Sequence, residues 1–214
     1  MTDIETKLIE QGYLTICGVD EAGRGPLAGP VYAAAVILPQ SVLLPPIVRL
    51  SSHERVSGIK DSKKLTQAAR ERLYDEIVSI AVSFSIGVAS SAEIDEFNIL
   101  NATFIAMNRA IEGLSIKPDI SLIDGNRNAG IKHHNKCITG GDNKSLSIAA
   151  ASILAKVSRD RYMLELSKKY PQYAFEKHKG YGTKLHYEML CKHGPSDIHR
   201  VTFLKGMGAK NGHS

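Results

Sequence analysis

Four short apolar runs, rich in β-branched residues, place the strongest constraint on the fold of this chain. They span residues 14–20, 31–38, 82–89 and 120–123. Glycine, proline, aspartate or asparagine residues follow or separate most of them, and such turn-forming residues commonly bound β-strands. The sequence therefore predicts a β-sheet assembled from short strands that are spread along the chain.

Segments with helical periodicity lie between and after these runs. The predicted helices span 66–81, 90–114, about 148–169 and 184–192. In the first of them, apolar residues recur at helical spacing with charged residues between them. Ser90 and Glu93 open the second with the spacing of a capping box. Strands that alternate with helices are typical of the α/β class, and we predict a long surface loop at 39–64.

The length of the chain favours one principal domain over two equal ones. A chain of 214 residues is long enough to bury one sizeable core but short for two. We therefore predict a main α/β domain over residues 1–170. Residues 171–214 are expected to form a C-terminal helical extension that ends in a disordered tail.

The charge balance and the cysteines bear on partners and location. Lys and Arg number 27 against 22 Asp and Glu, a net charge of +5, which favours polyanionic partners such as nucleic acids. No run reaches the roughly 20 apolar residues of a membrane span, and the acidic start lacks the layout of a signal peptide. Three cysteines without a CxxC pair fit a reducing compartment. We therefore predict a cytoplasmic protein with no membrane partner.

Acidic residues stand at the ends of three predicted elements. Asp20 and Glu21 close the first strand, Asp124 follows the strand at 120–123, and Asp142 precedes the long helix. In open α/β sheets the ends of strands and the starts of helices border a crevice where ligands bind. Hard divalent cations such as Mg²⁺ take oxygen ligands. Because several carboxylates held together repel one another, a bound cation is their natural partner.

Each acid also has a purely structural interpretation. The acidic segment 124–126 could be only a turn, and Asp142 could be only a helix cap. Asp20 and Glu21 carry a geometric condition, because neighbouring residues on a strand point to opposite faces. They would share one site only if the strand ended between them, and the glycines that follow allow such a turn.

The segment Gly23-Arg24-Gly25 follows the paired acids directly. Its glycines allow backbone amides to approach a ligand closely, and the arginine between them can reach a phosphate. Taken alone, the same residues could be a plain tight turn. A dinucleotide-binding fingerprint fits less well, because the spacing to Gly29 is one residue too long and Pro26 lacks an amide N–H that such a loop uses.

Basic residues are spread over several segments and could either be gathered into a groove for nucleic acid or form solvated faces. They are Lys60, Lys63, Lys64, Lys156, Arg159, Arg161, Lys177, Lys179 and Arg200. Tyr181 lies between two glycines, where its ring suits stacking on a sugar or a base as well as packing.

Two other kinds of site have weaker support. His133, His134 and Cys137 lie close together, with Cys191 and His193 further on, but their spacing matches no paired zinc-ligand motif. Eight histidines permit a base beside a serine or cysteine nucleophile. The chain contains no Gly-x-Ser-x-Gly elbow, so this interpretation is set aside.

Several motifs occur in one order over about residues 14–204. They are Gly18-Val19-Asp20-Glu21-Ala22-Gly23-Arg24-Gly25-Pro26, Asp61-Ser62-Lys63-Lys64-Leu65, Asp124-Gly125-Asn126, Ala150-Ala151-Ser152-Ile153-Leu154-Ala155-Lys156-Val157, His178-Lys179-Gly180-Tyr181-Gly182-Thr183 and His199-Arg200. Together they closely resemble the bacterial ribonuclease HII family, the type 2 ribonucleases H. Arg24 between the two glycines separates the chain from the sister ribonuclease HIII type.

The resemblance implies a ribonuclease H-like fold, in which helices flank a mixed five-stranded sheet and a small helical part follows. It implies an endonuclease that hydrolyses the RNA strand of RNA–DNA hybrids. It further implies nicking of DNA on the 5′ side of single embedded ribonucleotides, with 3′-hydroxyl and 5′-phosphate ends. The implied cofactor is Mn²⁺ or Mg²⁺, with two ions during catalysis, and we expect a monomer.

The same resemblance implies roles for individual residues. The family's four metal-site carboxylates, which are also its catalytic residues, would be Asp20, Glu21, Asp124 and Asp142. The residues that contact the substrate would be Gly23, Arg24 and Gly25 at the ribose 2′-hydroxyl, Tyr181 on the neighbouring deoxyribose, and Lys63 at a phosphate. The chain has Gly140 where many members of the family carry a lysine.

A different class of function remains as an alternative. A module that has lost catalysis could still recognise RNA–DNA hybrids through its basic residues. The presence of acids at all four positions of the family's metal site argues against this alternative, and a cleavage assay separates the two.

Overall fold

The structure is a computed structural model that describes residues 3–44, 59 and 66–205 of the chain. Its strands are β1 (Ile16–Ala22), β2 (Val31–Ile37), β3 (Ser83–Ala89), β4 (Ile120–Asp124) and β5 (Asn135–Ile138). Its α-helices are α1 (Asp3–Glu10), α2 (Gln40–Leu43), α3 (Gln67–Ile80), α4 (Ser91–Glu112), α5 (Leu146–Lys169), α6 (Phe175–His178), α7 (Lys184–His193) and α8 (Val201–Leu204). Two short 3-10 helices, η3 (Gly141–Asn143) and η4 (Pro171–Tyr173), flank α5.

The strands form one mixed sheet with the order β3-β2-β1-β4-β5. β1 pairs with β2 and β2 with β3 in antiparallel fashion. β1 pairs with β4 and β4 with β5 in parallel. The prediction of a mixed five-stranded sheet flanked by helices is confirmed. β1 lies at the centre of the sheet, between β2 and β4.

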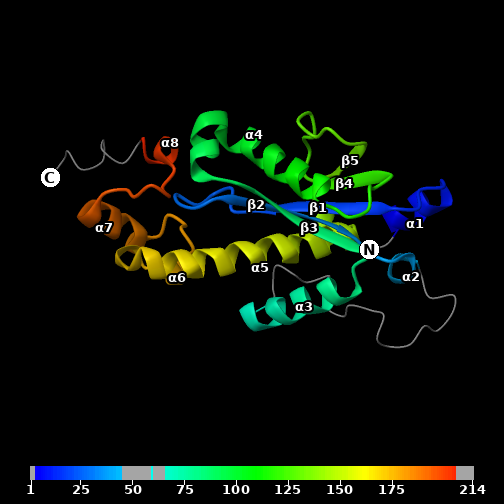
Figure 1. Ribbon diagram of the computed structural model, residues 1–214, viewed down its shortest axis with the longest axis horizontal. Helices are drawn as coiled ribbons and strands as arrows, with labels where there is room; N and C mark the ends of the chain where they lie inside the picture. The colour runs from blue at the N-terminus through cyan, green and yellow to red at the C-terminus, as the bar shows by residue number, and fades with distance from the viewer. Residues whose placement is uncertain (1–2, 45–58, 60–65, 206–214) are drawn as a thin grey trace.

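Helices cover both faces of the sheet (Figure 1). On one face, α4 packs against strand residues that include Val19, Val31 and Ala33. On the other face, α3 and α5 pack against residues that include Ala34 and Val36. Successive side chains of a strand point to opposite faces. The fully buried strand β2 therefore contributes side chains to the cores on both faces of the sheet.

The approach of α5 to β1 is close because small residues meet there. A Cβ atom added at Gly18 would lie 2.1 Å from the backbone carbonyl carbon of Ser147. Three small residues of α5, Ala149 to Ala151, are fully buried against the sheet. This contact brings the N-terminal half of α5 alongside the acidic end of β1.

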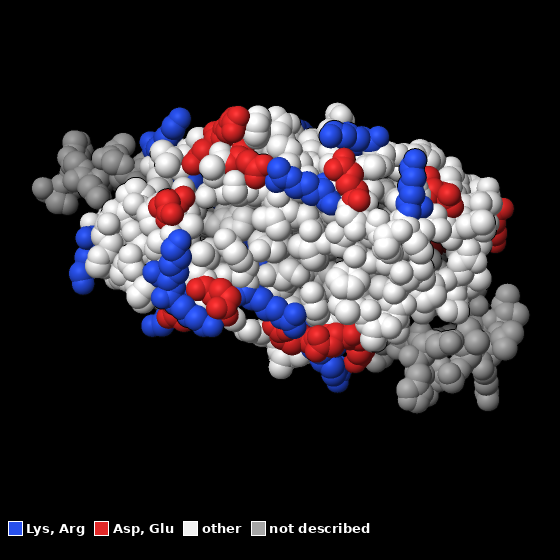
Figure 2. All heavy atoms as spheres, viewed as in Figure 1, with Lys and Arg blue, Asp and Glu red and all other residues white. Residues whose placement is uncertain are grey.

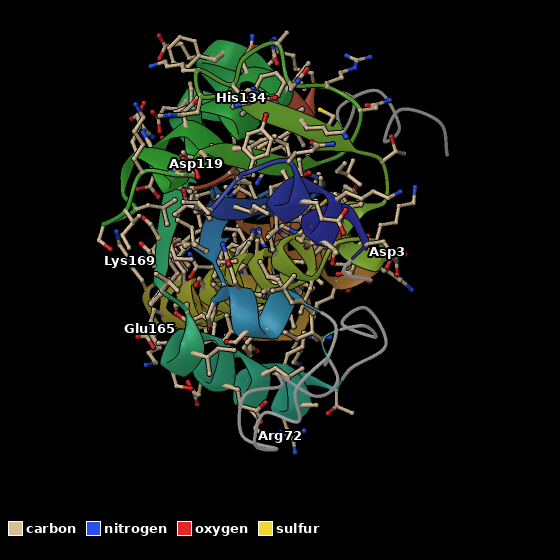
Figure 3. All side chains as sticks on the ribbon, turned by 90° about the vertical axis from the view of Figure 1, so that its right-hand side faces the viewer. Asp3, Arg72, Asp119, His134, Glu165 and Lys169 are labelled. Carbon is tan, nitrogen blue, oxygen red and sulfur yellow. The ribbon has the colours of Figure 1, made fainter. Side chains whose placement is uncertain are left out.

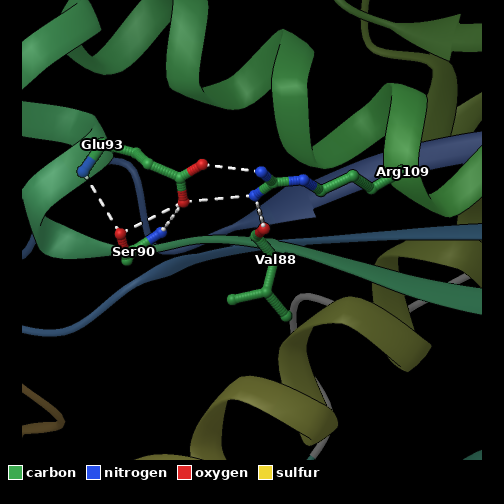
Figure 4. Close-up of polar contacts among 4 residues, drawn as sticks. All are labelled: Val88, Ser90, Glu93 and Arg109. Carbon is green, nitrogen blue, oxygen red and sulfur yellow. Dashed lines mark hydrogen bonds and ion pairs between the residues drawn. The ribbon is translucent and has the colours of Figure 1, made fainter.

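The start of α4 is fixed by the predicted capping box and by a distant arginine (Figure 4). The Glu93 amide donates to Ser90 Oγ at 3.2 Å, and the Ser90 amide donates to Glu93 Oε2 at 2.8 Å. Arg109, further along the same helix, donates to both Glu93 oxygens and to the Val88 carbonyl at the end of β3. The guanidinium holds the pKa of the Glu93 carboxyl down to about 2. These bonds fasten α4 to the edge of the sheet.

The opposite end of the sheet is held by Asp119, just before β4. Its carboxylate accepts the amides of Leu14 and Thr15 at 2.9 and 2.8 Å, and these bonds lower its pKa. The His134 ring lies 3.0 Å from the Asp119 carbonyl oxygen, through its Nδ1. Figure 3 labels both residues on the face that carries α1. The starts of β1, β4 and β5 are therefore aligned at this end, away from the acidic strand ends.

The C-terminal helices pack onto the end of α5 (Figure 1). Tyr173, Phe175 and Leu190 form a small core with Leu27 and Met163. A carboxylate of α4 also caps α8, because the Val201 and Thr202 amides donate to Asp95. The expected helical C-terminal extension is present, and it contacts the loop that follows β1.

Several boundaries differ from those predicted. β1 spans 16–22 rather than 14–20, and β5 forms at residues 135–138, where no strand was predicted. Asn98, with a φ of 67°, kinks α4, and its side chain caps the helical turn that follows. The predicted loop at 39–64 begins with α2. Most of that loop, together with the predicted disordered tail at 206–214, lies outside the described residues.

In the portion of the chain that the structure describes, none of the helices has the length and apolar character needed to cross a membrane.

Candidate active site

Asp20 and Glu21 lie within β1 rather than after it. They pair with Ala34 and Ala33 of β2, so the strand does not end between the two acids, and the geometric condition set for a shared site is not met in that form. Asp20 faces α5 and is 6% exposed, with Ser152 as a hydrogen-bonding neighbour. Glu21 points toward the α4 side, as alternation along a strand requires. The two carboxyl groups still lie close enough to interact electrostatically.

Asp124 closes β4 beside the acids of β1. Val19 and Ile123 are paired in the parallel register, so the next residue of each strand is an aspartate. Asp124 Oδ1 accepts the Gly141 amide at 2.6 Å. The 124–126 segment is thus a turn and also a carboxylate position at the junction of β1, β4 and η3.

Neighbouring carboxylates make Asp20 and Glu21 harder to ionise. Burial raises the pKa of Asp20 well above its usual range, and the charges of Glu21 and Asp124 add to the effect. Burial also raises the pKa of Glu21, although the Arg24 guanidinium opposes this rise. A buried group of like charges is stabilised by a cation. The electrostatics of this corner therefore favour a bound divalent ion.

Asp142 reaches the same region from η3. Its side chain is 3% exposed, and Oδ1 accepts the Asn143 side-chain amide at 3.0 Å. The structural interpretation of Asp142 as the cap of the long helix is wrong, because Ser145 caps α5 through a 3.2 Å bond from the Ile148 amide. Gly141, the neighbour of Asp142, bonds to Asp124, so η3 is attached to the acidic end of β4.

The acids are held by protein partners in this structure. Within the described ranges, no three Asp, Glu, His or Cys side chains are already gathered at metal-ligating positions. Glu21 instead pairs with Arg24 at 3.2 Å, and Asp124 accepts from Gly141. An all-oxygen donor set at a buried, anionic corner nevertheless fits a hard divalent cation such as Mg²⁺ or Mn²⁺. Binding an ion would exchange these partners for metal contacts.

Two buried arginines support the loop that carries Gly23, Arg24 and Gly25. Arg200 donates to the carbonyls of Gly23, Arg24 and Gly29 at 2.6, 2.9 and 2.9 Å. Arg159 donates to three further backbone carbonyls, at Ala28, Pro30 and Lys179. Both side chains are fully buried. Burial, together with the neighbouring Arg159, lowers the pKa of Arg200 to about 9.

These supporting roles were not found by sequence reasoning, which placed Arg159 and Arg200 among candidate groove residues. No sequence signal separates a buried arginine that bonds to carbonyls from an exposed one, since both stand among polar neighbours. Arg161 pairs with Glu71, and Lys156 with Asp160 at 2.7 Å. On the face that Figure 2 shows, basic and acidic side chains are interspersed rather than gathered by sign.

The Gly23→Ala substitution is expected to disturb this loop strongly. Gly23 has a φ of +96°, and an added Cβ would lie 2.0 Å from Arg159 Nε. Backbone strain and overpacking together should lower the free energy of unfolding by about 2 kcal/mol. Denaturant unfolding measures this loss, and Gly12→Ala is the matched control, because Gly12 has a φ of +94° with no atom near its added Cβ. Equal losses in the two variants would show that the contact with Arg159 is unimportant.

Tyr181 lies beside the loop and lines a cavity of about 320 Å³. Its side chain is 41% exposed. Lys156 Nζ and the Arg159 guanidinium carbon lie 5.9 and 5.8 Å from the centre of its ring. Other residues that line the cavity are Glu21, Gly23, Arg70 and Ser152. The sequence-predicted residues Glu21, Gly23 and Tyr181 therefore share one recess.

A second recess opens on the α4 side of β1. It is lined by Glu21, Arg24, Asp124, Asn126 and Arg127, with apolar residues of α4 below. Glu21 borders both recesses, so the end of β1 forms the ridge between them. Gly25 has free space around its Cα atom, because an added Cβ would contact only the Tyr181 ring, at 3.9 Å. Lys63 lies outside the described residues, so its predicted phosphate contact stays a prediction.

Comparisons with known proteins give a consistent result. A family model described as Ribonuclease HII matches residues 17–205. A Ribonuclease HII of Caldicellulosiruptor bescii is 54% identical over 96% of this chain and 94% of its own length. The solved ribonuclease H2 of Pyrococcus horikoshii is 29% identical, with a TM-score of 0.71 over 92% of this chain and 97% of that chain.

A more distant solved structure shares the fold alone. It is Bst-RNase HIII in complex with Mn²⁺, which is 19% identical, with a TM-score of 0.70 over 92% of this chain and 69% of that chain.

Proposed function

The chain belongs to the ribonuclease HII family, and from that premise we propose that it nicks duplex DNA on the 5′ side of single embedded ribonucleotides. As a ribonuclease H it is a metal-dependent hydrolase that acts on the RNA strand of RNA–DNA hybrids. Cleavage is proposed to leave 3′-hydroxyl and 5′-phosphate ends. The observation that carries this proposal is the convergence of Asp20, Glu21 and Asp124 at one corner of the sheet.

The proposed catalytic residues are the four carboxylates. Asp20 and Asp124 would hold divalent ions between β1 and β4, with Glu21 and Asp142 completing the donor set. Two bound Mn²⁺ or Mg²⁺ ions would supply an activated water and would stabilise the charge that develops on the leaving 3′-oxygen. The protein contributes a corner in which Asp20 and Asp142 are buried, and electrostatic effects are stronger at buried positions than in water.

The proposed sensor of the ribose 2′-hydroxyl is the loop of Gly23, Arg24 and Gly25. Its left-handed Gly23 and the three carbonyl bonds from Arg200 fix the backbone next to the acids. Arg24 pairs with Glu21, so the group that reads the sugar lies beside a group at the reaction centre. This arrangement supports coupling of recognition to cleavage.

The remaining contacts complete the proposal. Tyr181 would stack on the neighbouring deoxyribose from the edge of its recess, and Lys63 would contact a phosphate. We propose residues 1–170 as the catalytic domain and 171–214 as a substrate-binding extension, since the latter carries Tyr181. We also propose that the protein is a cytoplasmic monomer. Its proposed binding partners are RNA–DNA hybrids and DNA duplexes that contain ribonucleotides.

Arg24→Ala is expected to impair cleavage at a lone ribonucleotide more than binding of long hybrids. A site built to bond a hydroxyl loses discrimination when its polar partner is removed. We expect kcat/KM on the single-ribonucleotide duplex to fall by about a hundredfold, with hybrid affinity changed by less than about tenfold. Steady-state kinetics on both substrates measure the difference. The same loss on both substrates would show that Arg24 is only a phosphate clamp.

The proposed function is tested with an end-labelled duplex that contains one ribonucleotide, with and without Mg²⁺ or Mn²⁺. The expected result is a metal-dependent nick on the 5′ side of the ribonucleotide and no cleavage of an all-DNA control. If only long RNA–DNA hybrids were cleaved, the protein would still be a ribonuclease H, but the proposed recognition of a single embedded ribonucleotide would be excluded. Tight hybrid binding with no cleavage under either metal would favour the silent binding module instead.

A further inference from the structure

Three buried histidines lie behind the loop that carries Tyr181. His178, His186 and His199 are 7%, 0% and 2% exposed. The rings of His178 and His186 stack with their centres 4.4 Å apart, and His186 Nε2 lies 3.1 Å from His199 Nε2. The rings of Tyr173 and Phe175 enclose them. This His178–His186–His199 cluster lies outside the carboxylate corner.

Backbone groups fix the proton positions along two of these rings. The Ser196 amide donates to His199 Nδ1 at 2.9 Å, so that nitrogen must be an acceptor. The proton of a neutral His199 ring is then on Nε2, where it donates to His186 Nε2. His186 must therefore carry its proton on Nδ1, which donates to the Tyr181 carbonyl at 2.9 Å. A single directed chain of hydrogen bonds runs from Ser196 to Tyr181.

The third ring is fixed independently. His178 Nδ1 accepts the Gly180 amide at 3.2 Å, so its proton is on Nε2, where it donates to the Tyr173 carbonyl at 2.9 Å. His178 thus holds the other side of the loop and stacks on His186. Each polar atom of the three rings has a backbone or imidazole partner, and each partner is consistent with a neutral ring.

The chain of hydrogen bonds links two parts of the proposed substrate site. His199 pairs with Ala28 in an isolated bridge, and its neighbour Arg200 supports the loop of Gly23 and Arg24. The other end of the chain holds the Tyr181 backbone. One segment, 196–200, therefore sets the position of both loops.

We propose that His186 and His199 are positioning residues that fix Tyr181 for substrate binding, through a hydrogen-bond chain that exists only while both rings are neutral. This inference rests on the proposed contact between Tyr181 and substrate. A proton added to His186 would be on Nε2, facing the His199 Nε2–H across the 3.1 Å contact. A proton added to His199 would be on Nδ1, facing the Ser196 amide N–H at 2.9 Å. Either repulsion would displace the rings that hold the Tyr181 carbonyl.

The surroundings support neutral rings. Burial lowers the pKa of His178 and His186, and burial together with the nearby His186 lowers that of His199 to about 4. Other titratable or charged groups near the cluster are Tyr173, Glu176, Lys179, His193 and Asp197. Two arginines are also near: Arg159 donates to the Lys179 carbonyl, and Arg200 follows His199 in the chain. Since an ordinary imidazole has a pKa near 6.5, the lowered pKa of each ring favours its neutral form at pH 7, and His199 should stay neutral at pH 6 as well.

Nitrogen-15 NMR of the histidine rings tests the chain without reference to activity. The expected spectrum at pH 7 shows His199 and His178 protonated on Nε2 and His186 protonated on Nδ1, and the His199 signals should not change down to pH 6. An imidazolium at either His186 or His199, or the opposite assignment of their protons, would overturn the proposal. The free protein suffices for this measurement.

A fluorescence reporter tests whether the chain positions the loop. The chain contains no tryptophan, so Tyr181→Trp introduces a single probe at the loop. His186→Phe keeps the ring volume but removes both hydrogen bonds, whereas His186→Asn keeps an N–H near the Tyr181 carbonyl. We expect His186→Phe to shift the Trp emission and His186→Asn to restore most of it. Lys192→Asn, on the exposed face of the same helix, is the control and should leave the emission unchanged.

Kinetics connect the position of the loop to substrate. With Tyr181 in place, His186→Phe should raise KM about tenfold and leave kcat within about twofold, with His186→Asn closer to the unmodified protein. Circular dichroism excludes unfolding. Equal KM values and equal emission in the Phe, Asn and unmodified proteins would overturn the inference. If Tyr181→Ala leaves KM unchanged, the proposed function of Tyr181 fails, and the NMR and emission results still decide the hydrogen-bond chain.

Discussion

Asp20→Asn is expected to slow cleavage at least about a thousandfold while the fold is retained or becomes more stable. Asn keeps the shape of the side chain and an oxygen that can accept the Glu21 amide, as Asp20 Oδ1 does at 2.7 Å. It removes the negative charge with which Asp20 is proposed to hold a divalent ion. Loss of activity without loss of stability separates a functional acid from a structural one.

The pH dependence of stability follows from the raised pKa of Asp20, caused first by burial and then by Glu21 and Asp124. In the unfolded chain this carboxyl ionises near its usual pKa of 3.8, but in the folded protein it resists ionisation. Its destabilising contribution is therefore absent below about pH 4 and grows as the pH rises toward the folded pKa. Asp20→Asn should be more stable than the unmodified protein at pH 7, and the difference should vanish at low pH.

Denaturant unfolding at pH 7 and in acid, beside a single-turnover cleavage assay, checks both parts of this prediction. Asp75→Asn is the control, since Asp75 is an exposed acid of α3 with a 77% exposed side chain. It should change neither property. Near-normal cleavage by folded Asp20→Asn would contradict the assignment of Asp20 to the metal site.

Arg200→Met is expected to cost about 3 kcal/mol of stability and to abolish recognition of a lone ribonucleotide. Methionine fills a similar volume but leaves the carbonyls of Gly23, Arg24 and Gly29 without their donors. A buried acceptor that loses its only partner costs about 1–3 kcal/mol. Relief of the desolvated guanidinium, whose pKa burial lowers to about 9, offsets part of that cost.

Thermal and denaturant unfolding measure the stability of this variant. The rate of cleavage of the single-ribonucleotide duplex shows whether the loop of Gly23, Arg24 and Gly25 still recognises its substrate. Arg72→Met is the control, because Arg72 is a surface residue of α3 with a 69% exposed side chain. Arg200→Lys should recover part of the stability, since one ammonium can replace some of the three donors. Unchanged stability and unchanged cleavage in Arg200→Met would show that the loop holds its own conformation.

The strands and long helices were predictable because their apolar patterns are regular. The capping box of Ser90 and Glu93 was found from spacing alone and is confirmed in α4. β5 was missed, because its four residues are largely polar and only Ile138 is buried. A short edge strand such as β5 is stabilised by its pairing with β4, and its own sequence carries no apolar pattern that would predict it.

The carboxylate corner was predictable in part. Asp124 could be placed beside β1 because it directly follows a buried strand. The position of Glu21 within β1 was missed, since pairing with Ala33 extends the strand beyond the apolar run. The supporting Arg200 and the neutral histidines were not predictable, because their roles depend on backbone carbonyls and amides brought together only by the fold.

The central claim is that the carboxylates of β1 and β4 bring a divalent ion to the phosphate on the 5′ side of a ribonucleotide. The most direct test replaces one non-bridging oxygen of that phosphate with sulfur, which binds Mg²⁺ poorly and softer metals better. We predict that one diastereomer is cut at least about tenfold more slowly in Mg²⁺, and that Mn²⁺ or Cd²⁺ restores its cleavage. Equal cleavage of both diastereomers under every metal, or cleavage without metal, would contradict the claim.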